Sequence, residues 1–140
     1  MKKGQLSFDF VIAMSFLILF LQSFVAFSDS LIFDQDVISV RAQQTGILNQ
    51  VEQTIMNGNV ISGAGAASIS YLVPAIKSPS GRQVNSCFVS LGNVAGATRI
   101  TSSVDLEGAG TLTVTKDVPL SNLNLPAGNT NCGSTLTLSK

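Results

Sequence analysis

The sequence contains no histidine and no tryptophan, and only two of its 140 residues are cysteines. Without histidine, neither a Ser-His-Asp nor a Cys-His catalytic arrangement can form. Two cysteines are also too few ligands for a typical zinc site. The acids Asp105, Glu107 and Asp117 are scattered over expected turns and strands, where we interpret them as solvated carboxylates. We therefore expect no enzyme, no cofactor and no metal.

Charged residues are scarce as well, at 11% of the chain, and the 8 basic and 8 acidic side chains cancel. No net charge is available to attract nucleic acid. Lys77, Arg82, Arg99 and Lys116 are isolated in the sequence and lack the aromatic neighbours typical of nucleic-acid binding. We expect no nucleic-acid partner, and a surface made polar mainly by serine, threonine, asparagine and glycine.

The longest feature that is present is an apolar stretch near the N-terminus, from Phe8 to Phe27. Between Lys3 and Asp29 the only ionisable side chain is Asp9. As an α-helix, this stretch of 20 residues is about 30 Å long, which matches the hydrocarbon core of a bilayer. The stretch therefore predicts a helix that can cross a membrane.

Two general interpretations of this stretch leave features unexplained. A secretory signal peptide would account for Lys2 and Lys3, and Ala26-Phe27-Ser28 has the small-x-small pattern of a cut site. The apolar core of such a peptide, however, is typically only about 7–15 residues long and carries no acid. A plain transmembrane anchor would keep the lysines on the cytoplasmic side. It gives no reason for Asp9, because an acid near the membrane core costs roughly 2.5–3.5 kcal/mol.

The residues Gly4-Gln5-Leu6-Ser7-Phe8-Asp9-Phe10 resemble the class III signal peptide of archaeal type IV pilins. That pattern is Gln-x-Ser-x-Glu-Phe, placed directly after a small residue and a short leader that contains lysine, here Lys2 and Lys3. Gln5, Ser7 and Phe10 match the pattern. Asp9 departs from the usual glutamate by one methylene, which keeps the charge and shortens its reach. With the long helix that follows, the resemblance covers roughly the first 55 residues.

The resemblance implies that residues 1–4 are a leader, which a prepilin peptidase of the aspartic membrane type removes between Gly4 and Gln5. The implied partners are other copies of the chain in a helical filament, a pilus assembly ATPase and membrane platform proteins. The implied location is the cytoplasmic membrane for the precursor and the extracellular surface for the filament. The implied roles are surface adhesion and cell–cell contact. Gln5 and Asp9 are the residues that we expect to act in assembly.

Two alternatives remain beside a pilin. One is a membrane-anchored extracellular binding protein that is displayed singly and never polymerises. The other is an archaellin-like filament subunit, although the Gln-x-Ser-x-acid-Phe pattern favours a pilin.

The helix is expected to continue past the membrane, over residues 5–57. This range has no proline and a single glycine, Gly46, and its second half is amphipathic. The expected apolar face of that half consists of Val37, Val40, Ile47, Leu48, Val51 and Ile55. Asn57-Gly58 predicts the end of the helix, because glycine readily adopts the left-handed cap conformation. A continuous helix of this range would be roughly 80 Å long, and the alternative is two helices bent near Gly46 or near residues 28–30.

The rest of the chain predicts a linker over residues 58–68 and a β-rich domain over residues 69–140. Apolar and polar residues alternate in several short segments separated by turn residues, at 68–76, 84–91, 100–106, 111–118 and 135–139. Pro74 predicts either an edge position for the first strand or the end of that strand. The predicted fold class is α+β, with one antiparallel sheet that packs one face on the long helix.

The two cysteines, Cys87 and Cys132, are expected to form a disulfide, because both lie in the part of the chain that would be outside the membrane. Closing a loop of about 46 residues would stabilise the fold by roughly 4 kcal/mol on the chain-entropy model. The alternative is a pair of free thiols, since the sequence does not establish that the two residues are close.

Overall fold

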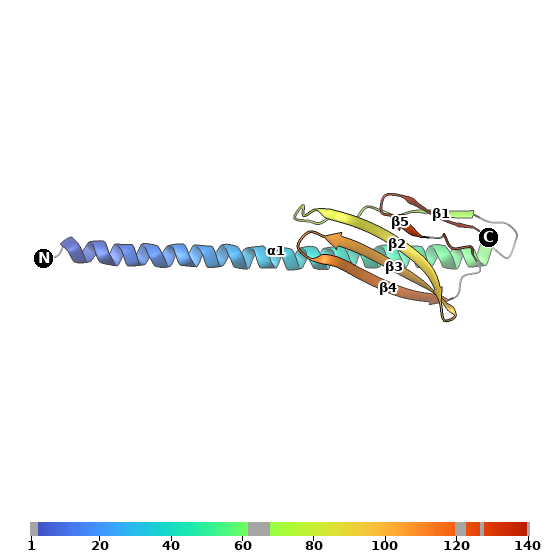
Figure 1. Ribbon diagram of the computed structural model, residues 1–140, viewed down its shortest axis with the longest axis horizontal. Coiled ribbons are helices and arrows are strands. Elements are labelled where there is room, and N and C mark those ends of the chain that lie inside the picture. Colours follow the sequence, from blue (N-terminus) through green and yellow to red (C-terminus); the bar gives the residue numbers. More distant parts are fainter. Residues whose placement is uncertain (1–2, 62–67, 120–122, 127, 140) are drawn as a thin grey trace. The chain divides into compact units, whose positions relative to one another are not determined.

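The computed structural model describes residues 3–61, 68–119, 123–126 and 128–139, and the side chains of these residues except 3–7 and 61. It has one long helix followed by antiparallel strands, which confirms the predicted α+β class (Figure 1). The described chain forms two compact units, Met1–Gln35 and Asp36–Lys140, and we describe each by itself.

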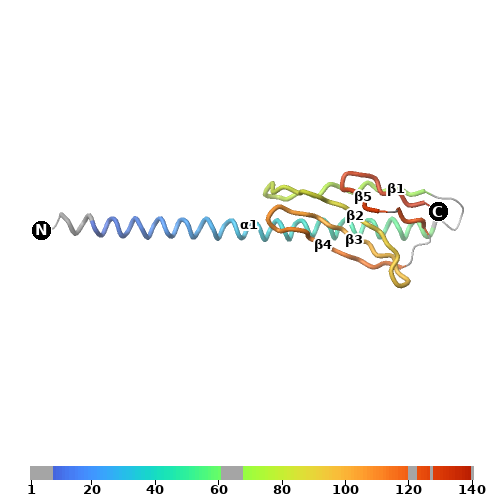
Figure 2. Tube along the Cα trace, in the orientation of Figure 1, coloured from blue at the N-terminus to red at the C-terminus, as the bar shows by residue number. Residues whose placement is uncertain are grey.

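The helix α1 extends from Lys3 to Ile61 as a single element. It continues through Gly46 and through residues 28–30, so the alternative of two bent helices is wrong; the trace in Figure 2 follows it without a break. The predicted end at Asn57-Gly58 is also wrong, because α1 continues to Ile61. The linker accordingly does not begin at residue 58, and residues 62–67 of the expected linker lie outside the described residues.

Gly58 has a different role from the expected cap. It is buried, and it is not among the glycines with positive φ. A Cβ atom at this position would lie 2.6 Å from Leu123 Cδ1 and 3.0 Å from Ile69 Cδ1. The glycine therefore allows the segments that carry Ile69 and Leu123 to approach the helix closely, and it does not reverse the chain.

In the first unit, α1 carries apolar side chains that no other described part of that unit covers. Three serines of α1 lie among or next to these apolar side chains. Each serine hydroxyl donates a hydrogen bond to the backbone carbonyl four residues earlier: Ser15 to Val11, Ser23 to Leu19 and Ser28 to Phe24. The hydroxyls are thus satisfied within the helix, as an apolar environment requires.

In the second unit, one face of α1 packs against the strands. The expected apolar face is confirmed: Val37 is half-buried, and the other predicted members Val40, Ile47, Leu48, Val51 and Ile55 are buried. These residues join buried side chains of the strands, including Val89, Ile100, Val104, Leu136 and Leu138, in one hydrophobic core. Each fully buried aliphatic side chain of this kind contributes roughly 1.5–3 kcal/mol.

The strands form two sheets, so the prediction of one sheet is wrong. The strands are β1 (Ser68–Leu72), β2 (Val84–Val94), β3 (Ala97–Leu106), β4 (Gly110–Pro119), β5 (Asn129–Asn131) and β6 (Thr135–Ser139). Four of them form a sheet in the order β4-β3-β2-β5, and β1 pairs with β6 in a separate ladder. All pairs are antiparallel. Pro74 lacks the backbone N–H group that would extend β1, and β1 ends at Leu72.

The disulfide between Cys87 and Cys132 is confirmed, with a Cα–Cα distance of 5.4 Å. Cys87 lies in β2 and Cys132 in the turn between β5 and β6. In the same turn, Cys132 N donates a hydrogen bond to Cys87 O at 3.0 Å, and Gly133 N donates one to Val73 O at 2.7 Å. The disulfide therefore links β2 to the turn in which the chain passes from the four-stranded sheet to the β1–β6 ladder.

The close contact at Gly58 generates the first prediction. Gly58→Val should destabilise the second unit by about 1–3 kcal/mol, because Leu123 and Ile69 must move to admit the side chain. Gly46 is the matched control, since it lies in the same helix and nothing lies within 4 Å of an added Cβ. Gly46→Ala should stabilise the protein by up to about 1 kcal/mol through helix propensity. Thermal unfolding of the full chain in detergent measures both effects, and equal tolerance of the two substitutions would contradict this role of Gly58.

Candidate assembly surface

The largest feature without a covering partner is the apolar surface of α1 in the first unit. Its large exposed side chains are Phe8, Phe10, Val11, Ile12, Met14, Phe16, Leu17, Ile18, Leu19, Phe20, Leu21, Phe24, Val25, Phe27, Leu31 and Ile32. We call these residues the apolar helix surface. Within the described residues, α1 is long and apolar enough to cross a membrane, and the window that meets this criterion is not buried inside the protein. The helix is therefore compatible with membrane insertion.

The residues of the N-terminal motif lie at the beginning of this helix. Lys2 lies outside the described residues, while Lys3, Gly4, Gln5 and Ser7 belong to α1 by their backbone alone. Asp9 and Phe10 are exposed. Asp9 follows Gln5 by four residues, a spacing that places two residues on nearly the same face of a helix. Of the two residues that we expect to act in assembly, the Asp9 side chain is described and the Gln5 side chain is not, so their role stays a prediction.

In the second unit, a carboxylate is buried where the sequence indicated a polar helix position. Only 1% of the Asp36 side chain is exposed. One carboxylate oxygen accepts a hydrogen bond from Ser80 N at 3.1 Å, and the other accepts from Ser80 Oγ and from Arg82 Nε, the latter at 3.1 Å. Hydrogen bonds from the Ser80 side chain and backbone and from Ser78, together with the Arg82 charge, hold the pKa of Asp36 below its ordinary value, although burial acts in the opposite direction. Asp36 thus fastens the turn at residues 78–81 to the helix.

Gln44 is a second buried polar residue, and it was not among the residues expected to be buried. It is fully buried, and its Nε2 donates to Ser102 O at 3.1 Å and to Leu112 O at 3.0 Å, on the neighbouring strands β3 and β4. Its Oε1 has no partner among the described protein atoms. A signal was present in the sequence, because Gln44 falls at an apolar position of the repeat that contains Val40, Leu48 and Val51.

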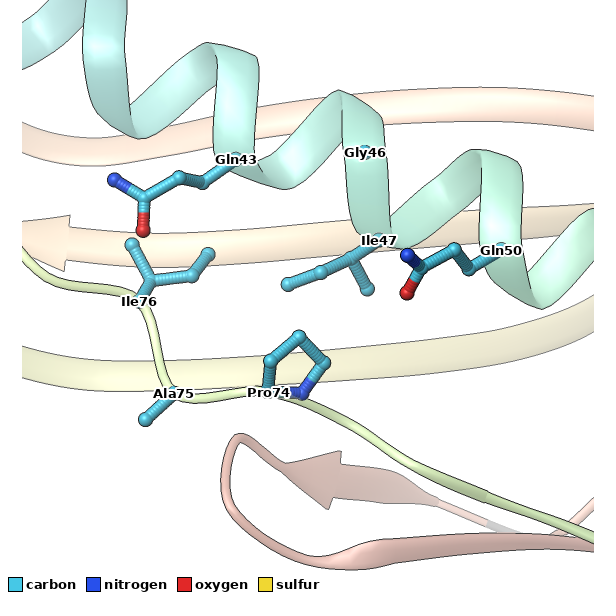
Figure 3. Close-up of a pocket in the computed structure, with 7 residues that line it drawn as sticks. All are labelled: Gln43, Gly46, Ile47, Gln50, Pro74, Ala75 and Ile76. Atoms are coloured by element: carbon cyan, nitrogen blue, oxygen red, sulfur yellow. The ribbon is translucent and has the colours of Figure 1, made fainter.

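A shallow hollow of about 220 Å³ lies beside α1 in the second unit (Figure 3). It is lined by Gln43, Gly46, Ile47, Gln50, Pro74, Ala75 and Ile76. The Gln43 amide is occupied by the backbone of Lys77, donating to its carbonyl at 2.8 Å and accepting from its N–H at 3.2 Å. Gln50 Oε1 accepts a hydrogen bond from the Tyr71 hydroxyl. The Gln50 amide therefore holds β1 against the helix and the Gln43 amide holds the segment after β1, so the two are not free polar groups.

Three of the four basic residues that looked isolated in the sequence have acidic partners in the second unit. Arg82 pairs with Asp36, Arg99 donates two hydrogen bonds to Asp117 at 2.7 and 2.8 Å, and Lys116 pairs with Glu52. The hydrogen bonds and charge of Arg99 lower the pKa of Asp117, and those of Asp117 raise the pKa of Arg99. Residues that are isolated in the sequence thus acquire partners, because strand pairing and the helix–sheet contact bring distant positions together.

Asp105 in β3 and Glu107 in the turn after it also have partners. Asp105 accepts a hydrogen bond from Asn85 Nδ2 at 3.2 Å, and Glu107 accepts one from Gln83 N at 3.3 Å. Asp117 and Glu107 are nevertheless exposed, as expected of solvated carboxylates, and Asp105 is half-buried. In the part of the chain that the structure describes, no group of three His, Cys, Asp or Glu side chains is placed to hold a metal ion.

The order of elements, an exposed apolar N-terminal helix followed by antiparallel sheets, fits a pilin-like architecture. In comparisons with protein-family models, curated proteins and solved structures, no significant match to this chain was found.

The geometry at Asp36 generates the second prediction. Because its pKa is lower in the folded chain than in the unfolded one, its stabilising effect is present above the unfolded pKa of about 3.9 and is lost as the pH falls through the folded value. We expect Asp36→Asn to lower the melting temperature at neutral pH and to make it less dependent on pH in the acid range. Asp34→Asn is the matched control, because Asp34 is exposed on the same helix. Thermal unfolding between neutral and acid pH tests this, and equal effects of the two substitutions would contradict it.

Proposed function

We propose that this chain is a pilin, the structural subunit of an archaeal type IV-like surface pilus that serves surface adhesion and cell–cell contact. The observation that carries the proposal is the apolar helix surface, at whose N-terminal end the acid Asp9 lies four residues after Gln5. A helix of this kind requires lipid or other protein around it. In a pilin, lipid surrounds the helix first, while the subunit is in the membrane, and other subunits surround it afterwards, in the filament core.

The proposed sequence of events begins with a prepilin in the cytoplasmic membrane, anchored by α1. A prepilin peptidase cleaves between Gly4 and Gln5, and the apolar segment stays in the mature chain. A pilus assembly ATPase and membrane platform proteins then add the subunit to a filament, in which the apolar helix surface packs against the helices of other copies. Helices that leave lipid for such a bundle associate mainly through close packing and polar contacts, because lipid is already apolar.

The proposed role of Asp9 is to neutralise the amine that cleavage creates. Cleavage creates a positive α-amine at Gln5, and transfer into the filament brings this amine and the Asp9 carboxylate into an apolar bundle. A buried charge without a partner is costly, whereas a paired one is tolerated and can set the register between helices. We propose that Asp9 of one subunit pairs with the Gln5 amine of a neighbouring subunit. The alternative is that Asp9 pairs with the amine of its own chain and complements the helix N-terminus.

The third prediction concerns the cut. The mature protein should begin at Gln5, and peptide mass analysis of the N-terminus of the purified surface protein measures this. Gly4→Phe should leave the uncut precursor in the membrane, because the position before the cut requires a small residue in the resembled family. Gly46→Phe provides a bulky substitution elsewhere in α1 and should not affect cleavage. A mature chain that began at Asp29 would instead support a conventional secretory signal peptide.

The fourth prediction concerns assembly. Asp9→Ala should be inserted and cleaved, yet it should polymerise poorly, because the partner amine would be buried without a counter-charge. Asp9→Glu should assemble normally, since glutamate is the usual residue in the resembled motif. Electron microscopy of the surface fraction, with cleavage checked by mass, measures both variants in cells that lack the unmutated subunit. Normal filaments from the Asp9→Ala chain would rule out the assembly role of Asp9.

The same microscopy distinguishes a pilin from a membrane-anchored protein that is displayed singly. Filaments that contain the unmutated chain support the proposal. A cleaved, surface-exposed chain that is found only as a monomer in the membrane would overturn it.

A further inference from the structure

A second hollow in the second unit, of about 400 Å³, lies beside the first residues of β2. On the side away from β3, β5 pairs with β2 only over residues 88–90. Residues 84–87 of β2 therefore have no strand next to them on that side within the described chain, and all four line the hollow. The segment after β1 and the end of β5, with the turn that follows it, provide the rest of the lining.

The polar part of the lining begins at a β-bulge in β2. Val84 pairs with Leu106 of β3, and Ser86 pairs with Asp105. Asn85, between them, is thus an extra residue without a partner on β3. Neighbouring side chains of a regular strand point to opposite faces of the sheet, and a bulge interrupts this alternation. Asn85 and Ser86 are accordingly both exposed, and both line the same hollow.

The hollow contains hydrogen-bonding groups that no other described residue uses. Asn131 at the end of β5 is exposed, and its side-chain amide has no partner among the described protein atoms. The hydroxyl of Ser86 likewise has none. Asn85 Nδ2 donates to Asp105 at 3.2 Å, which fixes this amide and leaves its Oδ1 as an acceptor. The three side chains together offer both donors and acceptors to a ligand.

Other contacts hold the walls of the hollow in place. The disulfide joins Cys87 of β2 to Cys132 of the turn after β5, and both residues line the hollow. In the same turn, Ser134 N donates to Asn131 O at 3.0 Å, which fixes the backbone that carries the free amide. A site that is formed before binding costs less ordering when the ligand arrives.

The chemistry of the lining favours a neutral ligand that is rich in hydroxyl groups. No charged side chain lines the hollow, and the Asp105 carboxylate that contacts Asn85 would repel an anion. Amides and hydroxyls pair well with sugar hydroxyls, because each can both donate and accept. Ala75, Ile76 and Val84 add apolar surface, against which the C–H face of a sugar ring can pack.

We propose that this hollow binds a neutral carbohydrate, and we call Asn85, Ser86 and Asn131 the asparagine site. Its volume lies within the range of about 300–1,000 Å³ that is usual for ligand pockets. Binding itself requires only the folded chain, whereas its use in adhesion rests on the filament function proposed above. A filament would repeat the site in every subunit, and such repetition raises the overall affinity by roughly 10²–10⁴ over that of one weak site.

The test measures binding to the full-length chain in a detergent without sugar groups and to purified filaments. The probes are soluble neutral oligosaccharides of glucose, galactose, mannose and N-acetylglucosamine, and sialylated and sulfated oligosaccharides are the charged comparison. Saturation-transfer NMR detects binding to the single chain, and an array of the same oligosaccharides detects binding to filaments. We expect neutral probes to bind and charged probes to bind more weakly.

Ser86→Ala and Asn131→Ala each remove a hydrogen-bonding group that no described residue uses. Each should leave the melting temperature unchanged and weaken binding of the neutral probe by about 2- to 10-fold, as expected for one lost hydrogen bond. The double variant should lose more than either alone. Asn129→Ala is the matched control, because Asn129 is exposed on the same strand as Asn131 and does not line the hollow. It should bind like the unmutated chain.

Several results would overturn the site. These are the absence of binding of any neutral probe to the chain and to filaments, unchanged binding by both Ser86→Ala and Asn131→Ala, an equal loss in Asn129→Ala, and tighter binding of charged probes. If the unmutated chain forms no filaments, the pilin proposal fails, and the NMR measurement on the single chain still decides the site. If filaments form normally and bind no neutral probe, the site is wrong and the pilin proposal stands.

A final comparison distinguishes the two sources of such a ligand, the glycans of a cell surface and free sugars. Filaments that bind intact cells, and that lose this binding after periodate oxidation of the cell-surface sugars or through Asn131→Ala, take a surface glycan. Filaments that bind the soluble probes and not the cells take free sugar by the same site.

Discussion

The rest of the structure depends on an apolar helical surface that its own unit does not cover. Side chains such as Phe16 and Phe20 are 69% and 68% exposed, and large apolar residues follow one another along α1 from Phe8 to Ile32. Moving one such side chain from water into an apolar environment is favourable by roughly 1.5–3 kcal/mol. The surface is therefore stable only with lipid or other protein around it, and this requirement relates the fold to membrane insertion.

The same helix meets the opposite requirement in the second unit, where strands cover one of its faces and water reaches the other. A helix suits both environments because it satisfies its backbone hydrogen bonds internally and needs no partner from its surroundings. The two units differ in the hydrogen-bond partners of the polar side chains of α1. In the first unit the serine hydroxyls bond back to the helix, whereas in the second unit Asp36, Gln43 and Gln44 bond to turns and strands far away in sequence.

The sequence by itself determined the features that depend on neighbouring residues. The apolar stretch predicted the exposed helix, and the spacing of Val40, Ile47, Leu48, Val51 and Ile55 predicted its buried face, because helical periodicity is a local property. Alternation of apolar residues predicted β1, β2, β3, β4 and β6 within a few residues. The pairing of Cys87 with Cys132 followed from composition and location, since two cysteines allow one bridge. The three-residue strand β5 was missed, because a segment that short carries no periodic pattern.

Only the tertiary structure decided which distant segments meet. It divided the strands into two sheets, because β6 pairs with β1, more than sixty residues earlier in the chain. It gave Gly58 a packing role in place of the expected cap, and it found partners for Arg99, Asp117 and Lys116. It also gave Gln44, which is buried between helix and sheet, its hydrogen-bond acceptors on β3 and β4. The physical reason is the same in each case: local periodicity specifies the face on which a side chain lies, whereas its partner depends on contacts between residues far apart in the sequence.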